Sequence, residues 1–307
     1  MILQEIGIVT RIPRQLPDPI RTSFGPMTKR FDGRRSPTQI GEMIFGFRKE
    51  RRRRRLRAKP FPEEWLKLIK RNVAFFSRLS PADRNELLGH LQVFLSEKRF
   101  EGCDGLQLTD EILVTIAAQA CLLLMHRKTD YFPRLITILV YPSQYAVEEN
   151  RPIQEHVWEQ GQTVRLGETS RQLGSMVLAW DAVKFGASDP SDGKNLVLHE
   201  FAHQLDYENY LADGVPALAT RAEQLAWREV MRTEFASLRA AEQTGIPTLL
   251  DTYGATNPPE FFAVATEAFF ERPHALRAHH PKLYAELQRY FQQDPVEFSA
   301  EPARSAQ

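Results

Sequence analysis

Leu196-Val-Leu-His-Glu-Phe-Ala-His-Gln-Leu-Asp206 is the stretch of sequence that decides the fold. Its apolar residues Leu198, Phe201 and Leu205 recur at the spacing of one helix face, which predicts a helix packed against a core. The motif His199-Glu200-Phe-Ala-His203 lies inside this helix. Residues four apart lie on one helix face about one turn apart, so both imidazoles can bind one ion. The stretch therefore predicts a metal site on a core helix.

The chemistry of such a site depends on the residue that follows the first histidine. Glu200 projects beside the ion, where it can take a proton from water and later hand it to the leaving amine. A chance match to this pattern is expected in about one chain per hundred of this size, so the motif alone does not establish a metal site. Two histidines exposed on an ordinary helix are the alternative, but they would not need the apolar positions around the motif. We predict a zinc-dependent peptidase with His199 and His203 as metal ligands and Glu200 as general base.

A third metal ligand must come from elsewhere, because a catalytic zinc ion has three protein ligands and one open position. The segment from Asp251 to Phe270 offers two carboxylates, Glu260 and Glu267. Pro258 favours a helix start that places Glu260 in the first turn. In the alternative interpretation neither binds metal: Glu260 only gains from the positive end of the helix, and Glu267 forms a surface ion pair. The residues alone do not decide which carboxylate completes the site.

Helical patterns dominate the rest of the chain, with two short β-branched segments between them. These patterns predict an α+β fold in which a small sheet lies among helices. Ser191 or Asp192 is predicted to cap the metal-site helix. The predicted helices cover residues 81–98, 111–126, 219–243, 258–271 and 281–292, and the predicted strands cover 135–141 and 174–181, with 162–168 as a candidate partner of the second.

The composition is that of an ordinary globular protein. Hydrophobic residues make up 42% of the 307 residues and charged residues 26%, and the formal net charge is +1. This balance gives no general attraction to nucleic acid or acidic membranes. Cys103 and Cys121 are too few for a disulfide framework, no signal peptide is visible, and the apolar stretch 112–125 is too short to span a membrane. We predict a cytoplasmic protein with no transmembrane segment and no specific nucleic-acid binding.

The N-terminal region differs in composition from the rest. Residues 1–42 are rich in Pro, Arg, Gly and Ser, and a basic run follows at Arg48–Arg57. Such a run is typical of a solvated flank, and attraction to acidic lipid or nucleic-acid phosphates is the alternative. The predicted organisation is a disordered basic extension at 1–58, a peptidase domain at 59–298 with a helical part at 59–130 and a catalytic part at 131–298, and a flexible tail at 299–307.

Two motifs, in order, resemble a known family. His-Glu-Phe-Ala-His-Gln-Leu-Asp from His199, and Asp-x-Tyr-x-Ala-Thr-Asn-Pro-x-Glu-Phe-Phe-Ala-Val from Asp251, closely resemble the Mlc titration factor A family. The likeness runs from about Phe45 to Pro295. The first motif and the Glu-Phe-Phe-Ala segment also resemble the catalytic domain of anthrax lethal factor. The resemblance implies a mainly helical, zincin-like metallopeptidase of the gluzincin type, with a small sheet beside the active-site helix and one Zn²⁺ ion.

The resemblance also implies roles for the candidate residues around the ion. Glu260 maps onto the third zinc ligand, beside His199 and His203. Tyr253 falls where lethal factor has a tyrosine near the metal, and its phenol would donate a hydrogen bond to the developing oxyanion. The alternative for Tyr253 is a packed core tyrosine.

Asp206 and Glu267 are candidates for outer carboxylates that orient a ligand imidazole. Asp206 is alternatively a cap of the helix end. Lethal factor has an acidic residue where this chain has Val264, so the surroundings of the ligands are not identical.

The biological role that the resemblance implies has two parts. The titration factors bind a glucose-responsive transcriptional repressor and show aminopeptidase-like activity on small peptides. We therefore predict an aminopeptidase-like zinc peptidase that also binds a repressor of the Mlc type; a non-catalytic protein that titrates the repressor is the alternative. Family members begin near Met43, so residues 1–42 are expected to be a dispensable extension or an upstream start-site artefact, which the intact mass of the native protein distinguishes.

Overall fold

The computed structural model describes residues 37–143, 145–154, 157–165, 167–170, 174–189 and 191–298. The expected tail at 299–307 lies outside this part of the chain. The chain divides into two compact units, Met1–Phe47 and Arg48–Gln307, and the fold below is that of the second unit. None of the helices in the described part is long and apolar enough to cross a bilayer.

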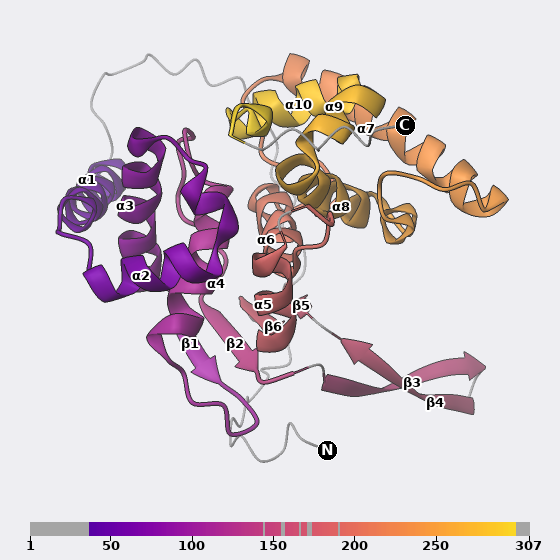
Figure 1. Ribbon diagram of the computed structural model, residues 1–307, viewed down its shortest axis with the longest axis horizontal. Helices are drawn as coiled ribbons and strands as arrows, with labels where there is room; N and C mark the ends of the chain where they lie inside the picture. The colour runs from indigo at the N-terminus through magenta and orange to yellow at the C-terminus, as the bar shows by residue number, and fades with distance from the viewer. Residues whose placement is uncertain are drawn as a thin grey trace, which may run out of the picture. The chain divides into compact units, whose positions relative to one another are not determined.

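A four-stranded sheet with the order β1-β2-β6-β5 forms the β part of the fold (Figure 1). In its central pair, Val140 lies opposite Leu178, and both side chains are fully buried. A separate antiparallel pair consists of β3 (Tyr145–Gln154) and β4 (Val157–Arg165). Three strands of the larger sheet are parallel and the edge strand β5 is antiparallel: β1 (Arg99–Gly102), β2 (Thr137–Tyr141), β6 (Ser175–Ala179) and β5 (Gly167–Ser170).

Helices make up most of the body, and local sequence explains where several of them begin. Ser80 accepts a hydrogen bond from Asp83 N at the start of α3, directly before Pro81, and Thr220 forms a capping box at the start of α7. The α-helices are α1 (Pro37–Arg57), α2 (Glu63–Asn72), α3 (Pro81–Glu97), α4 (Asp110–Leu122), α5 (Trp180–Ser188), α6 (Leu196–Asp206), α7 (Arg221–Thr244), α8 (Pro258–Glu271), α9 (Pro273–His279) and α10 (Pro281–Phe291). A mainly helical α+β fold with a small sheet is confirmed.

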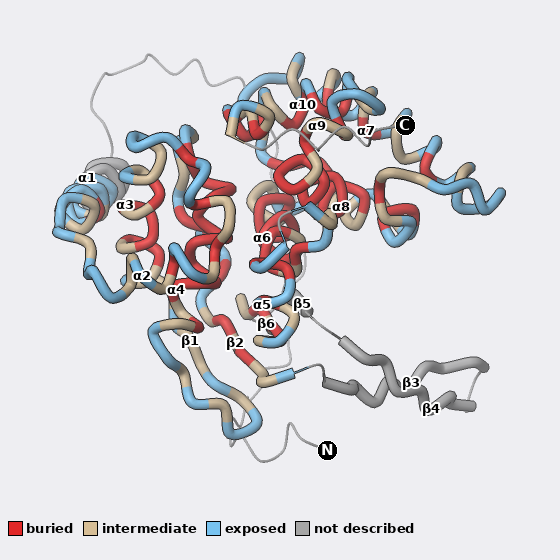
Figure 2. The backbone as a smooth tube through the Cα atoms, in the orientation of Figure 1, coloured by how far each residue is buried: buried red, intermediate tan, exposed pale blue. Residues whose placement is uncertain are grey.

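One continuous apolar core holds these elements together, and α4, α6 and α8 form its most buried part (Figure 2). Phe201 of α6 packs against Phe132 and Phe94, with ring centroids 4.7 Å and 5.7 Å away. On α8, Phe262 packs edge-on against Trp227 of α7 at 5.4 Å. Each buried aromatic side chain of this size stabilises the fold by about 2–3 kcal/mol. The helix with the histidine motif is therefore fixed on its apolar side.

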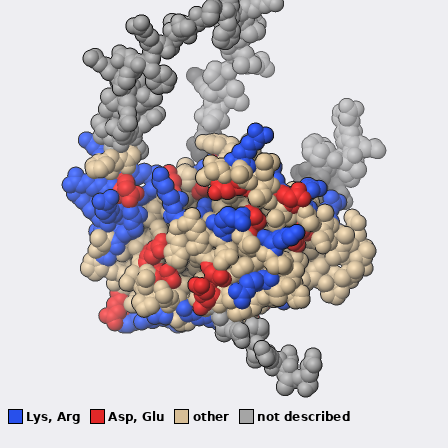
Figure 3. Space-filling view, turned by 90° about the horizontal axis from the view of Figure 1, so that it is seen from above, with Lys and Arg blue, Asp and Glu red and all other residues tan. Residues whose placement is uncertain are grey.

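The basic run differs from the expected disorder, because it forms the C-terminal half of α1. Arg53 is only 4% exposed and forms a bidentate ion pair with Glu97, at 2.7 and 2.9 Å. Its guanidinium also lies 4.6 Å from the centre of the Tyr131 ring. Basic side chains gather at one end of the surface shown in Figure 3. The basic residues that line a shallow groove along α1 and the turn after it are Arg48, Arg51, Arg52, Arg55 and Lys59.

Several expected boundaries were wrong, for local reasons. Asn195, rather than Ser191 or Asp192, caps the metal-site helix: its side chain accepts from Leu198 N. The strand expected at 174–181 ends at Ala179, and α5 begins at the next residue, Trp180. The expected partner 162–168 is divided, because Gly167 and Glu168 pair with β6 whereas residues 162–165 belong to β4.

Candidate metal centre

Helix α6 presents its histidines toward α8 because its other faces are fixed. Asn195 caps the first turn, and Leu198 and Phe201 are buried in the core. Helix α8 packs directly against α6, and its N-cap residue is Asn257, whose side chain accepts from Glu260 N. The cap holds Glu260 in the first turn of α8, where the positive helix end stabilises a carboxylate.

Glu260 meets both histidines at one point. Its Oε2 atom lies 3.0 Å from His199 Nε2 and 3.3 Å from His203 Nε2. The two imidazole rings are 4.9 Å apart and nearly perpendicular. One ligand atom from each of the three residues lies within 4.8 Å of the others, which is the spacing that a shared metal ion requires. The side chains are 10–17% exposed, so the site is mostly buried but partly accessible to solvent.

The hydrogen bonds of His199 indicate a place for a cation. Its Nδ1 lies 2.8 Å from Glu267 Oε1, and a carboxylate only accepts, so Nδ1 donates its proton. The neutral ring then presents a lone pair on Nε2 to Glu260. Two electron-rich atoms at this distance repel each other unless a proton or a metal ion lies between them. Two imidazoles and one carboxylate are the ligand set of one class of catalytic zinc site, so these residues fit the ion.

The pKa values of Glu260 and His199 are shifted by the same short contacts between carboxylates and imidazoles. Burial raises the pKa of Glu260, but hydrogen bonds from His199 and His203 outweigh burial and lower this pKa to about 2. Burial lowers the pKa of His199, whereas hydrogen bonds to Glu260 and Glu267 raise it, to about 10. The carboxylates therefore favour a positive charge between the two helices, which either a proton or a metal ion supplies.

A buried polar network supports the site from behind. Glu267 is 7% exposed, and its Oε2 accepts from Asn195 N at 2.6 Å. The Asn195 amide donates in turn to Gln119 Oε1 at 2.8 Å and to Glu271 Oε1 at 3.0 Å. Metal-bound histidines usually carry such an outer hydrogen-bond partner, which fixes the ring and its tautomer. Of these residues only Glu267 was predicted from the sequence; Asn195 was missed, although the preference of Asn for the N-cap position is a signal that could have identified it.

Glu200 and Tyr253 lie at the same site. Glu200 is 6% exposed, and its carboxylate is close enough to help raise the pKa of His199. Tyr253 belongs to the 3₁₀ turn Thr252–Ala255 before α8, and its ring centre is 6.0 Å from that of His199. With 56% of its surface exposed, Tyr253 is not a core tyrosine. Tyr253 is therefore a solvent-exposed residue beside the ring of His199.

Asp206 contacts neither imidazole by a hydrogen bond. It is fully buried at the end of α6, and its Oδ2 accepts from Gly214 N at 3.1 Å. Gly214 has a φ of +77°, and a Cβ there would lie 2.6 Å from Pro258 O, so only glycine fits. Asp206 therefore holds the loop that packs against the start of α8, and within the described chain His203 Nδ1 has no hydrogen-bond partner.

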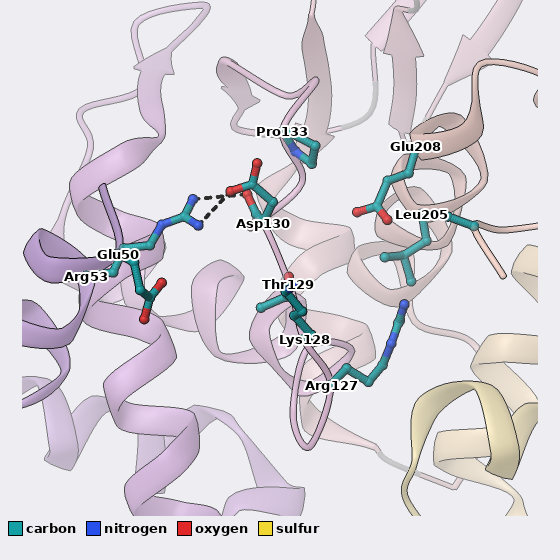
Figure 4. A pocket seen from close by; sticks show the side chains of 10 residues that line it. Glu50, Arg53, Arg127, Lys128, Thr129, Asp130, Pro133, Leu205 and Glu208 are labelled. Carbon is teal, nitrogen blue, oxygen red and sulfur yellow. Dashed lines mark hydrogen bonds and ion pairs between the residues drawn. The ribbon is translucent and has the colours of Figure 1, made fainter. Parts of the chain in front are cut away.

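A cavity of about 450 Å³ lies near the C-terminal end of α6 (Figure 4). Arg53 and Asp130 form an ion pair at one side of it, and Leu205, Glu208 and Arg127 line the other side. Burial raises the pKa of Glu208, and Arg127 opposes this shift. None of the three candidate metal ligands lines this cavity. It is therefore distinct from the metal centre.

Comparison with known proteins identifies the family. A family model described as glucose-regulated metallo-peptidase M90 matches residues 47–292. The chain belongs to this family. The resemblance inferred from the two motifs is therefore confirmed, and membership in M90 indicates a metallopeptidase with a bound metal.

Individual relatives of this M90 protein agree with the family match. An uncharacterized protein of Synechocystis sp. is 39% identical over 245 residues, which cover 80% of this chain and 89% of that protein. The Mlc titration factor A proteins of Yersinia pestis and Yersinia pseudotuberculosis are each 30% identical over 228 residues, covering 73% of this chain and 83% of theirs. The similarity therefore spans most of both chains.

Proposed function

We propose that this M90 protein is a zinc-dependent peptidase whose ion is held by His199, His203 and Glu260. The observation that carries the proposal is the convergence of these three side chains on one point between α6 and α8. Zinc, when bound, acts as a Lewis acid that polarises a peptide carbonyl and makes water a nucleophile at neutral pH. The cytoplasmic location predicted from the sequence remains part of this proposal.

The chain's own residues then move the protons and stabilise charge. Glu200 accepts the proton of the attacking water and returns it to the leaving amine. Tyr253 donates a hydrogen bond from its phenol to the oxyanion that develops on the substrate. Glu267 holds the His199 ring in one orientation through Nδ1, at 2.8 Å. Asp206 supports the loop at the start of α8 and acts through packing.

Replacement of the general base tests this assignment. We expect Glu200→Gln to bind zinc as the wild type does and to lose peptide hydrolysis by about 10²–10⁴-fold, because the amide cannot accept the proton. Bound zinc and the hydrolysis of small peptides are measured on the same preparation. His203→Ala is the matched control, which should lose the zinc ion of the α6–α8 site together with the activity. Normal hydrolysis by Glu200→Gln would refute the proposed role.

The bond that is cleaved is proposed to be the N-terminal peptide bond. This preference rests on the resemblance to the titration factors. A pair of peptides with the same sequence, one with a free and one with an acetylated N-terminus, tests it. Faster cleavage of the free peptide supports aminopeptidase action, and equal rates contradict it.

A second proposed function is the binding of a glucose-responsive transcriptional repressor. It is supported by the name of the Yersinia relatives, Mlc titration factor A, and by their coverage of this chain. The Glu200→Gln protein separates this function from catalysis, since its surface is unchanged. Capture of purified Mlc repressor by this variant supports binding without cleavage. Failure of both the wild type and the variant to bind the repressor contradicts the second function only.

A further inference from the structure

A second group of metal-ligating side chains lies outside the α6–α8 site. Asp83 and Glu86 belong to the first two turns of α3, three residues apart on one face, and His126 follows α4. His126 Nε2 is 2.7 Å from Asp83 Oδ1 and 3.5 Å from Glu86 Oε2. The three ligand atoms lie within 4.8 Å of one another, and the side chains are 24–36% exposed. An ion from solvent can therefore reach this cluster.

The tautomer of His126 favours a cation, as it does at His199. His126 Nδ1 lies 3.0 Å from the carbonyl oxygen of Gln292. A carbonyl oxygen only accepts, so Nδ1 donates and the neutral ring presents the lone pair of Nε2 to the two carboxylates. These three electron-rich groups face one another at short distances and repel each other unless a proton or a metal ion lies between them.

Both carboxylates are oriented by hydrogen bonds on their other oxygen. Asp83 Oδ2 accepts from Ser80 Oγ at 2.8 Å, which leaves Oδ1 to face His126. Glu86 Oε1 accepts from the backbone N–H of His126 at 2.7 Å and lies 3.3 Å from His90 Nε2, which leaves Oε2 to face the same point. Ligands that are each held by an outer hydrogen bond are typical of protein metal sites.

We propose that Asp83, Glu86 and His126 form a second divalent-cation site that accepts Zn²⁺ or a similar borderline ion. One imidazole and two carboxylates supply nitrogen and oxygen donors of the kind such ions bind, and two negative charges balance the ion. The site joins the start of α3, the turn after α4 and the end of α10, where Gln292 accepts from His126. Its role is to stabilise this junction, and it takes no part in hydrolysis.

A proton on His126 competes with the metal ion. Burial lowers the pKa of His126, but Asp83, the Gln292 carbonyl and Glu86 raise it above its usual value. An ion must displace this proton, so its affinity rises with pH. A simple ion pair between a protonated His126 and Asp83 is the competing arrangement, and it binds no metal.

Zinc binding to the full-length protein distinguishes these arrangements. The metal-free chain is dialysed against zinc sulfate at pH 7.5, and bound zinc is counted per chain. We expect about two ions in the wild type, about one in His126→Gln and about one in a His199→Ala/His203→Ala protein. Combining all three substitutions should leave none. His279→Gln, which removes an exposed histidine outside both clusters, is the control and should bind as the wild type does.

A second variant keeps the test valid if His126→Gln misfolds. Asp83→Asn preserves the shape of the side chain and should weaken the second binding event at least ~10-fold. Circular dichroism checks the fold of each variant. If Asp83→Asn and His126→Gln fold and bind as many zinc ions as the wild type, with unchanged affinity, the cluster is an ion pair only and the proposal fails. That outcome leaves the α6–α8 site unaffected, because its zinc is counted separately.

Discussion

At the scale of single residues, the metal centre depends on hydrogen bonds that allow only one orientation. Glu267 accepts from two fixed donors, His199 Nδ1 at 2.8 Å and Asn195 N at 2.6 Å. An ionised carboxylate satisfies both donors, because each oxygen accepts. The same residue therefore sets the ring orientation of one ligand and joins it to the cap of α6.

Replacing this carboxylate should weaken metal binding. In Glu267→Gln the side chain offers one acceptor and one donor, so its NH₂ group faces either His199 Nδ1–H or Asn195 N–H. We expect zinc affinity to fall by about 10–100-fold, measured by competition with a chelating dye. Glu242→Gln, on an exposed turn of α7, is the matched control. Equal affinities in the two variants would show that Glu267 does not position the ligand.

Glu271 is a buried acid in the same network, and it predicts a dependence of stability on pH. Burial is the main cause that raises its pKa, from 4.5 to about 9, although Asn195 donates to it. Between these values the unfolded chain loses the proton and the folded chain keeps it. The free energy of unfolding therefore falls as pH rises, by as much as about 1.4 kcal/mol per pH unit.

The variant Glu271→Gln removes the titrating carboxyl group, and with it this pH dependence, but retains an oxygen that accepts from Asn195. We expect wild type and variant to have similar stability near pH 4.5, and the variant to become the more stable as pH rises toward 8. Urea unfolding at pH 5, 6.5 and 8 measures the difference. A constant difference across these pH values would contradict a protonated Glu271.

At the scale of elements, one arginine fixes the basic helix to the body. Arg53 is 4% exposed and pairs with Glu97, whereas its neighbour Arg54 is exposed. The sequence pattern alone does not separate these two arginines, because both belong to an uninterrupted basic run. Only the fold identifies which member of the run faces Glu97 and Tyr131.

Truncating Arg53 should destabilise the protein, since Glu97 is left without its cation in a mostly buried position. For Arg53→Ala we expect a loss of about 3 kcal/mol in the free energy of unfolding, measured by urea denaturation. Arg54→Ala, one residue along the same helix, should change it by no more than about 0.5 kcal/mol. Similar effects of the two substitutions would contradict the structural role of Arg53.

The elements themselves were largely predictable where local signals are strong. Ser80-Pro81 marks the start of α3, and Pro258 marks the start of α8. The first turn of α6 was less predictable, because Ser191, Asp192 and Asn195 are all good cap residues. Strand β1 and helix α5 were missed, since both are short and their stability depends on neighbours in the sheet and core.

At the scale of the whole molecule, a metal ion would tie together two helices that are far apart in sequence. His199 and Glu260 lie on α6 and α8, and these helices pack directly against each other. An ion that binds only the folded chain stabilises it by mass action, by about 4 kcal/mol when free zinc exceeds Kd by 1,000-fold. Metal binding and folding are therefore expected to be coupled.

Removing zinc should lower the melting temperature. In the His126→Gln background, which lacks the second proposed site, we expect chelation to lower Tm by roughly 8–16 °C and added zinc to restore it. Scanning calorimetry measures the change. The His199→Ala/His203→Ala protein in the same background is the control and should not respond. A Tm that is equal with and without zinc would contradict metal binding at α6 and α8.

The sequence by itself determined the chemistry that is available: two histidines and a glutamate on one helix, a capped later helix with Glu260 and Glu267, and a mainly helical fold. These features depend on residues close in sequence, so their spacing predicts them. The residue pattern alone did not decide whether Glu260 or Glu267 is the third metal ligand, and the resemblance to the family favoured Glu260.

Only the tertiary structure brought Glu260 to Nε2 of both histidines, turned Glu267 toward Nδ1 of His199, and placed Asp206 against Gly214 instead of an imidazole. The reason is that side-chain direction between helices depends on how their apolar faces pack. Residues 61 to 68 positions apart meet here because Phe201 and Phe262 are buried in one common core.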